Sequence, residues 1–277
     1  MRGDAPRVEW RRGVEDNRSV MAVSPQHFTE VEGLRLQFRM RGAAGGEPLL
    51  MLHGWGGNSL SFMGAASLLE QRFRILTPDL PGFGFSEAPR EAWGSSDYAR
   101  VVAELIKTAG FQSAAVLGHS RGGTIALALA TAYPELVKKL VIVASPIVRL
   151  PPEPGVRQAS LRFTLLRRAA RLAPPLRERM LAWGRQRFGS EDYKSAGVLR
   201  PTLVRVVNED WRPALASIRA PVLLIWGSED TEVPPRVAEE AMTELADARL
   251  VTLQGAGHFP FLDQPEAFAE AVTSFLG

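Results

Sequence analysis

Short apolar runs alternate with longer amphipathic stretches through most of the chain. Two alternating runs meet at Gly33 and predict an antiparallel hairpin over 27–32 and 34–41. Continuous apolar runs predict buried strands near 48–53, 74–78, 116–117, 138–144, 221–226 and 249–253. Between them, helices are expected over 61–71, 96–109, 124–133, 235–246 and 264–276. Ser95 or Ser96 is expected to cap the second helix, and Asp263 with Glu266 predicts a capping box at the last one.

This alternation predicts an α/β fold with a mostly parallel, eight-stranded sheet. The predicted strands are apolar throughout, as expected when helices cover both faces of a sheet. In such sheets, functional residues collect in the loops at the carboxyl ends of the strands. Here those loops follow His53, Leu117, Trp226 and Leu253.

Residues 148–213 interrupt the alternation with several prolines and helical stretches rich in arginine. They predict a helical lid inserted into an α/β core formed by residues 26–147 and 214–277, after a polar leader over residues 1–25. The apolar side chains of the lid, Phe163 and Leu166 among them, are expected to form the roof of a substrate pocket.

The sequence Gly118-His119-Ser120-Arg121-Gly122 follows an apolar run and precedes a good helix former. A strand, a sharp turn and a helix in this order predict a nucleophile elbow, which exposes a serine hydroxyl at the end of a sheet. The alternative is that Ser120 only caps a buried helix.

Serine needs an adjacent base, and the chain has four histidines. His27 lies in the first hairpin, His53 ends a strand before a tight turn, and His119 flanks Ser120 inside the elbow. His258 lies in a glycine-containing loop that follows the last predicted strand, so it is the candidate base.

A carboxylate should fix the tautomer of the base. Asp230 follows a buried strand and is the candidate, with the adjacent Glu229 as its rival. The backbone N–H groups of Arg121 and Trp55 are expected to form the oxyanion hole. The Trp55 ring is expected either to line the acyl pocket or to pack against the lid.

Composition narrows the classes of function. The 277 residues are 45% hydrophobic and 23% charged, which is typical of a globular protein. The absence of cysteine excludes disulfides and thiolate sites, and no metal or cofactor is expected. The chain has neither a membrane-length apolar run nor a secretory signal, so a cytoplasmic protein is expected. A net charge of +3 is too small to suggest a nucleic-acid partner.

The motifs together resemble the α/β-hydrolase fold, in its lid-bearing group of esterases, lipases and C–C hydrolases. The matching segments are His53–Gly56, Asp79–Ser86, Gly118–Gly123, Trp226–Asp230 and Gly257–His258. Haloalkane dehalogenases and epoxide hydrolases of this fold carry aspartate where this chain has Ser120. The resemblance implies a serine esterase acting on a small-molecule ester, with Arg121 at a position more often held by methionine, leucine or glutamine.

The first two of these segments also resemble esterases that hydrolyse pimeloyl-carrier-protein methyl ester. Residues 151–217 carry a net charge of +7, from thirteen basic and six acidic residues. That charge could steer an acidic carrier protein, or the arginines could simply be the solvated faces of amphipathic helices. A C–C hydrolase with the same triad, a peroxidase-like side activity and a catalytically inactive scaffold are the remaining alternatives.

Overall fold

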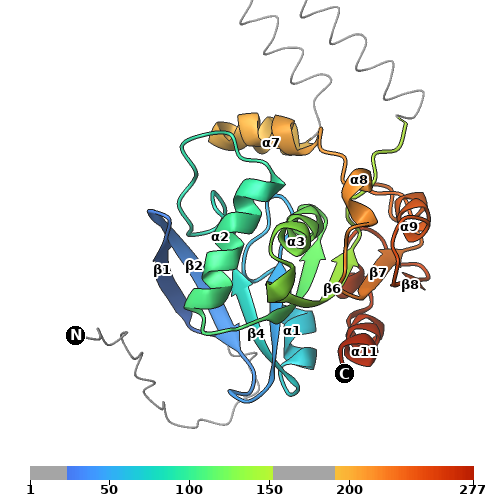
Figure 1. The fold of residues 1–277 in the computed structure, drawn as a ribbon, viewed down its shortest axis with the longest axis horizontal. Coiled ribbons are helices and arrows are strands. Elements are labelled where there is room, and N and C mark those ends of the chain that lie inside the picture. The colour runs from blue at the N-terminus through green and yellow to red at the C-terminus, as the bar shows by residue number, and fades with distance from the viewer. Residues whose placement is uncertain (1–23, 152–190) are drawn as a thin grey trace, which may run out of the picture.

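The computed structural model describes residues 24–151 and 191–277, and a sheet of eight strands forms the centre of this part of the chain (Figure 1). The sheet order is β1-β2-β4-β3-β5-β6-β7-β8. β1 and β2 form the predicted hairpin, β2 runs antiparallel to β4, and all further pairs are parallel. The strands are β1 (Gln26–Val31), β2 (Leu34–Arg41), β3 (Glu47–Leu52), β4 (Phe73–Pro78), β5 (Ala114–His119), β6 (Val137–Val143), β7 (Val222–Gly227) and β8 (Ala248–Leu253). The predicted α/β class and mostly parallel sheet are therefore confirmed.

Helices cover both faces of this sheet. α2 (Ser95–Thr108), α3 (Arg121–Ala132) and α9 (Arg236–Met242) pack on one face. α1 (Met63–Leu69), α10 (Pro260–Asp263) and α11 (Pro265–Leu276) pack on the other. Along β3, Leu50 and Leu52 face the first layer while Leu49 and Met51 face the second, and all four are buried. Because both faces of the strand are buried, its sequence is a continuous apolar run.

Two helix starts differ from the sequence prediction. The N-cap of α2 is Gly94, whose N–H donates to the Asp97 carboxylate at 2.8 Å, so neither Ser95 nor Ser96 is the cap. Asp263 ends α10, and its carboxylate accepts the Gly257 N–H at 2.8 Å instead of capping α11. The predicted last helix is α11, which begins at Pro265, and α10 is a separate short helix before it; both have proline at the first position.

The predicted lid is described only in part, and the candidate substrate-binding residues Phe163 and Leu166 lie outside the described residues. Residues 191–215, here called the return segment, lead back to β7. They contain the helices α6 (Glu191–Ser195), η3 (Gly197–Leu199), α7 (Arg200–Val206) and α8 (Arg212–Leu215). α7 lies near the start of α2, since Thr202 accepts the N–H of Trp93 at 3.2 Å (Figure 1).

The two ends of the inserted region are adjacent. The Asp210 carboxylate accepts the backbone N–H of Arg149 at 3.3 Å and that of Arg212 at 3.1 Å. The chain therefore leaves the core after β6 and returns to it at nearly the same place. A short helix, η1 (Pro134–Leu136), precedes β6. Within residues 24–151 and 191–277, no helix is long and apolar enough to cross a membrane.

The approach of α3 to the sheet leads to a stability prediction. A Cβ at Gly122 would lie 2.1 Å from the carbonyl oxygen of Leu52, a backbone atom that cannot rotate away. Gly122→Ala should therefore destabilise the protein by roughly 1–3 kcal/mol, as overpacking does, measured by chemical denaturation. Gly64→Ala is the matched control, because its Cβ meets no atom within 4 Å and alanine favours the helix. Equal stabilities of the two variants would contradict this reading of the elbow.

Candidate active site

Ser120 occupies a strained turn between β5 and α3. Its backbone has φ 49° and ψ −118°, a conformation that non-glycine residues rarely adopt. The turn is held by hydrogen bonds on both sides, from Ser120 N–H to the Val143 carbonyl at 2.8 Å and from the Ser145 hydroxyl to the Ser120 carbonyl at 2.6 Å. Strain of this kind persists only where the surroundings enforce it, and it is common at functional sites.

Asp230 and His258 are joined although they are 28 positions apart. The His258 Nδ1 lies 2.8 Å from the Asp230 carboxylate, whose other oxygen accepts the N–H groups of Glu232 and Val233, each at 2.9 Å. Both side chains are buried. A proton on Nδ1 satisfies the carboxylate and leaves Nε2 able to accept a proton. Glu229, the rival acid, is exposed in the same loop.

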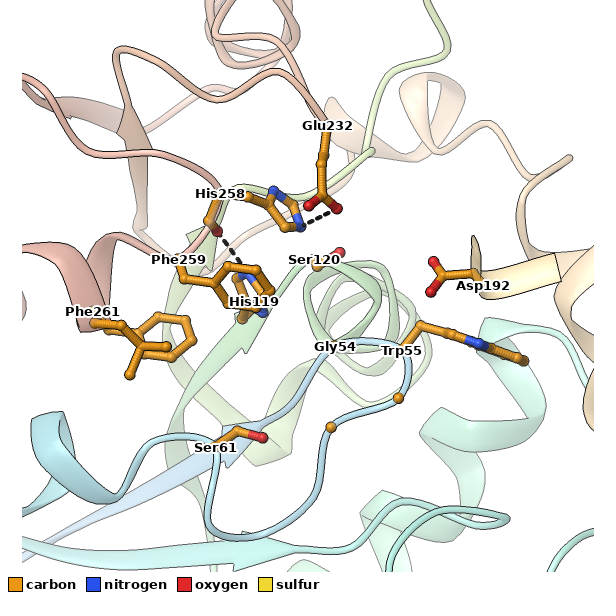
Figure 2. Close-up of a pocket in the computed structure, with 13 residues that line it drawn as sticks. Gly54, Trp55, Ser61, His119, Ser120, Asp192, Glu232, His258, Phe259 and Phe261 are labelled. Carbon is orange, nitrogen blue, oxygen red and sulfur yellow. Dashed lines mark hydrogen bonds and ion pairs between the residues drawn. The ribbon is translucent and has the colours of Figure 1, made fainter. Parts of the chain in front are cut away.

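Ser120 and His258 line one cavity of about 340 Å³ (Figure 2). Its wall is apolar at Phe259, Phe261 and Leu262. Asp192 and Glu232 add carboxylates to the lining of the cavity, and burial raises the pKa of Asp192. The cavity therefore combines a hydroxyl, an imidazole and an apolar surface with two acidic groups.

Glu232 is a residue that the sequence analysis did not select. Its carboxylate lies 3.7 Å from the His258 Nε2, on the side of the ring away from Asp230. The side chain is 63% exposed, so water screens this pair. Its position two residues after Asp230 in the same loop was the available signal.

The two predicted oxyanion donors lie on neighbouring loops. Arg121 is the first residue of α3, so its N–H has no partner within the helix. The loop after β3 lies against the elbow, because a Cβ at Gly54 would be 3.1 Å from the Ser120 Cβ. Trp55 lines the cavity, but its ring points away from Ser120 and meets the Phe83 ring at 5.0 Å (Figure 2). Trp55 also packs against an apolar cluster in the return segment, formed by Ala196, Leu203 and Val206, so it lies between the cavity and that segment.

Two further histidines have structural positions in the buried core. Leu80 N–H donates to the His53 Nε2 at 2.9 Å, and the His53 Nδ1 lies 2.8 Å from the Gly54 carbonyl. The His119 Nε2 lies 2.8 Å from the carbonyl of His258, and the two rings are in contact. Burial lowers the pKa of His53 to about 4 and that of His119 to about 3. Both imidazoles are therefore neutral near pH 7, and His119 braces the backbone of the candidate base.

The model of the alpha/beta hydrolase family matches residues 49–271, which is most of the chain. The chain belongs to the alpha/beta hydrolase family. This hydrolase is 33% identical to the pimeloyl-[acyl-carrier protein] methyl ester esterase of Nitrosomonas europaea, over 80% of this chain and 93% of that protein. It is 27% identical to Lipase 1 of Psychrobacter immobilis, over 94% of this chain and 86% of the lipase.

A hydrolase from Pseudomonas aeruginosa has a similar solved structure, with a TM-score of 0.71 and 27% identity over 91% of this chain and 98% of its own. In the α/β-hydrolase fold the triad partners follow one another in the order serine, acid, histidine. In this hydrolase Ser120 and His258 line the cavity, Asp230 is paired with His258, and the three follow the same order in the sequence.

The neutral buried histidines predict how the stability of this hydrolase depends on pH. The unfolded chain takes up protons below about pH 6.5, whereas His53 and His119 in the fold resist them down to about pH 4 and 3. The free energy of unfolding is therefore unaffected by the titration of these two histidines above pH 6.5. It decreases as the pH falls below that value, by about 1.4 kcal/mol per pH unit for each histidine.

The measurement is Tm between pH 7 and pH 4.5. His119→Gln keeps an N–H donor but cannot titrate, so its Tm should fall less steeply with decreasing pH than that of the wild type. Parallel Tm curves for the two proteins would show that His119 does not resist protonation.

Proposed function

We propose that the protein is a serine hydrolase that cleaves carboxylic esters through an acyl-enzyme. The observation that carries the proposal is the meeting of Ser120, at the strained elbow, with the Asp230-paired His258 at one cavity. Its membership of the alpha/beta hydrolase family and its esterase and lipase relatives support the same class of reaction.

In the first half of the reaction, the Ser120 hydroxyl oxygen attacks the ester carbonyl carbon while His258 Nε2 takes the hydroxyl proton. The carbonyl oxygen becomes an oxyanion and accepts hydrogen bonds from the N–H groups of Arg121 and Trp55. Asp230 stabilises the imidazolium through Nδ1. When the C–O bond of the ester breaks, His258 returns the proton to the departing alcohol.

In the second half, water attacks the acyl-enzyme and His258 takes one of its protons. A second oxyanion forms at the same two donors. Its collapse breaks the bond to Ser120, which regains its proton from His258, and the carboxylic acid leaves. One water is consumed for each ester, and the enzyme returns to its starting state.

The walls of the cavity favour an uncharged ester. Phe259, Phe261 and Leu262 supply apolar surface for an acyl or alcohol chain. Asp192 and Glu232 would repel a substrate that carries a carboxylate close to the reacting bond. The substrate that fits best is therefore a neutral ester with an apolar chain.

The methyl ester of a carrier-protein-bound acyl chain is a second candidate substrate. The Nitrosomonas relative is named for this activity and shares 33% identity with the chain. Such an ester is neutral at its reacting end, which is compatible with the acidic groups of the cavity. The net charge of +7 over residues 151–217 would attract an acidic carrier protein.

Removal of the nucleophile tests the reaction class. Ser120→Ala deletes one hydroxyl at a half-buried position, so it should abolish hydrolysis of p-nitrophenyl butyrate and labelling by a fluorophosphonate, while Tm changes little. Wild-type turnover in purified Ser120→Ala would overturn the proposed function.

Two amide substitutions test the choice of acid. Asp230→Asn should lower kcat by on the order of 10⁴, as in the serine protease case, because the histidine loses the partner that fixes its tautomer. Glu229→Gln is the matched control in the same loop, where the side chain is exposed, and should leave kcat within about twofold. A larger loss of kcat in Glu229→Gln than in Asp230→Asn would exchange the roles of the two residues.

A further inference from the structure

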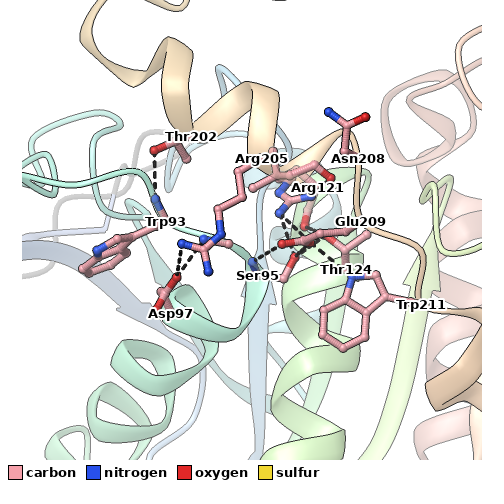
Figure 3. A network of polar contacts seen from close by, with 12 residues as sticks. Trp93, Ser95, Asp97, Arg121, Thr124, Thr202, Arg205, Asn208, Glu209 and Trp211 are labelled. Atoms are coloured by element: carbon pink, nitrogen blue, oxygen red, sulfur yellow. Dashed lines mark hydrogen bonds and ion pairs between the residues drawn. The ribbon is translucent and has the colours of Figure 1, made fainter.

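The side chain that follows the candidate nucleophile turns away from the cavity and is buried. The Arg121 guanidinium donates to the Ser95 hydroxyl at 2.7 Å, to the Val206 carbonyl at 3.1 Å and to the Glu209 carboxylate at 3.1 Å (Figure 3). Only 9% of the side chain is exposed. These acceptors belong to the start of α2 and to the return segment, so one side chain links the elbow to two other parts of the molecule.

Glu209 balances the buried charge and is itself held in place. Its carboxylate accepts the Ser95 N–H at 2.8 Å, the Ser95 hydroxyl and the Trp211 indole N–H at 3.2 Å. Burial alone would raise the pKa of Glu209, but the Arg121 charge and the Ser95 hydrogen bonds keep it below its usual value. The pair is therefore an ion pair with fixed geometry rather than a mobile surface contact.

The return segment also contacts the other predicted oxyanion donor. Leu203 and Val206 of α7 form an apolar cluster on which the Trp55 ring packs. Val206 thus belongs to the cluster on which Trp55 packs, and its carbonyl accepts from Arg121. The return segment therefore supports both residues whose N–H groups would face the oxyanion.

We infer that Arg121 and Glu209 form a clamp that fixes the return segment to the elbow and thereby sets the relative position of the two oxyanion donors. The inference rests on the proposed function. Arg121 would then serve the reaction twice, with its N–H as a donor and with its side chain as a positioning group. Oxyanion holes are effective because their donors are already in place before charge develops.

The donor geometry explains why the clamp needs arginine. A guanidinium presents five N–H donors in a planar fork and can reach acceptors on different segments at once. An ammonium group at the end of a lysine stem could pair with Glu209 but would not hold Ser95 and Val206 in the same arrangement. Arg121→Lys should therefore restore only part of the clamp.

The test compares variants that remove the side-chain contacts of the clamp but keep the backbone N–H groups at positions 121 and 55. Arg121→Met and Glu209→Gln each remove one charge, and the double variant removes both, so that no unpaired charge stays buried if a single variant fails to fold. Arg205→Met is the matched control. Arg205 lies on α7, as Val206 does, and contacts the Ala92 carbonyl and Asp97 near the start of α2. These contacts do not reach the elbow (Figure 3).

Each protein is titrated with a fluorophosphonate to count competent sites, and kcat and KM for p-nitrophenyl butyrate are then measured per site. Opening the clamp should lower kcat by about 10- to 100-fold with little change in KM, because misplaced donors cost mainly transition-state stabilisation. The inhibition constant of phenylboronic acid, whose adduct with serine resembles the tetrahedral intermediate, should weaken by a similar factor. Arg121→Lys should lie between wild type and Arg121→Met, and Arg205→Met should match wild type.

Unchanged kcat per titrated site in the double variant would overturn the clamp, even if Tm falls, because the network would then be purely structural. Equal losses in Arg205→Met and Arg121→Met would overturn it as well. Neither result bears on the proposed function, which stands if wild type hydrolyses the ester and Ser120→Ala does not.

Discussion

The close approach of α3 to the sheet is the constraint on which the candidate site depends. At Gly118, a Cβ would lie 2.3 Å from the Gly122 carbonyl oxygen, and at Gly122 it would lie 2.1 Å from that of Leu52. No side chain fits at either position, so the helix begins almost directly on the strands. Ser120 is then held in its positive-φ turn, and the first N–H groups of the helix, which have no partner within it, follow directly.

The other reactive groups reach the same point because parallel strands end at one edge of the sheet. β7 leads to Asp230 and β8 leads to His258, and their two loops pack on each other at Gly227, where a Cβ would meet the carbonyl oxygens of Ala256 and Gly257 at 2.2 Å. His119 adds a hydrogen bond to the carbonyl of His258 from inside the elbow. Ser120 and His258 are thus connected through the buried His119 ring and the packed loops, so their relative position does not depend on long flexible side chains.

Local pattern was sufficient to predict the sheet, its covering helices and the meeting of Ser120, Asp230 and His258. Apolar period, glycine spacing and strand ends are all properties of neighbouring residues. The contacts that were not predicted are between residues far apart in the sequence. Glu209 lies 88 positions from Arg121, and no local pattern shows that they form a buried pair. The cap of α2 was misassigned because the Ser95 hydroxyl accepts from Arg121 and donates to Glu209 instead of accepting an N–H of its own helix, and both partners are distant in sequence.

The shared anchor at Asp210 gives the fold a modular character. One carboxylate holds the backbone at Arg149 and at Arg212, so the points where the chain leaves the core and returns to it are fixed next to each other. The entropic cost of closing a loop between two such points grows slowly with its length, by about 0.6 kcal/mol for each doubling. Insertions of different length and sequence can therefore be exchanged at this position with little penalty to the core. An exchange confined to residues 152–190 would keep the return segment, with its contacts to Arg121 and to the start of α2, which makes this junction a suitable site for grafting foreign segments.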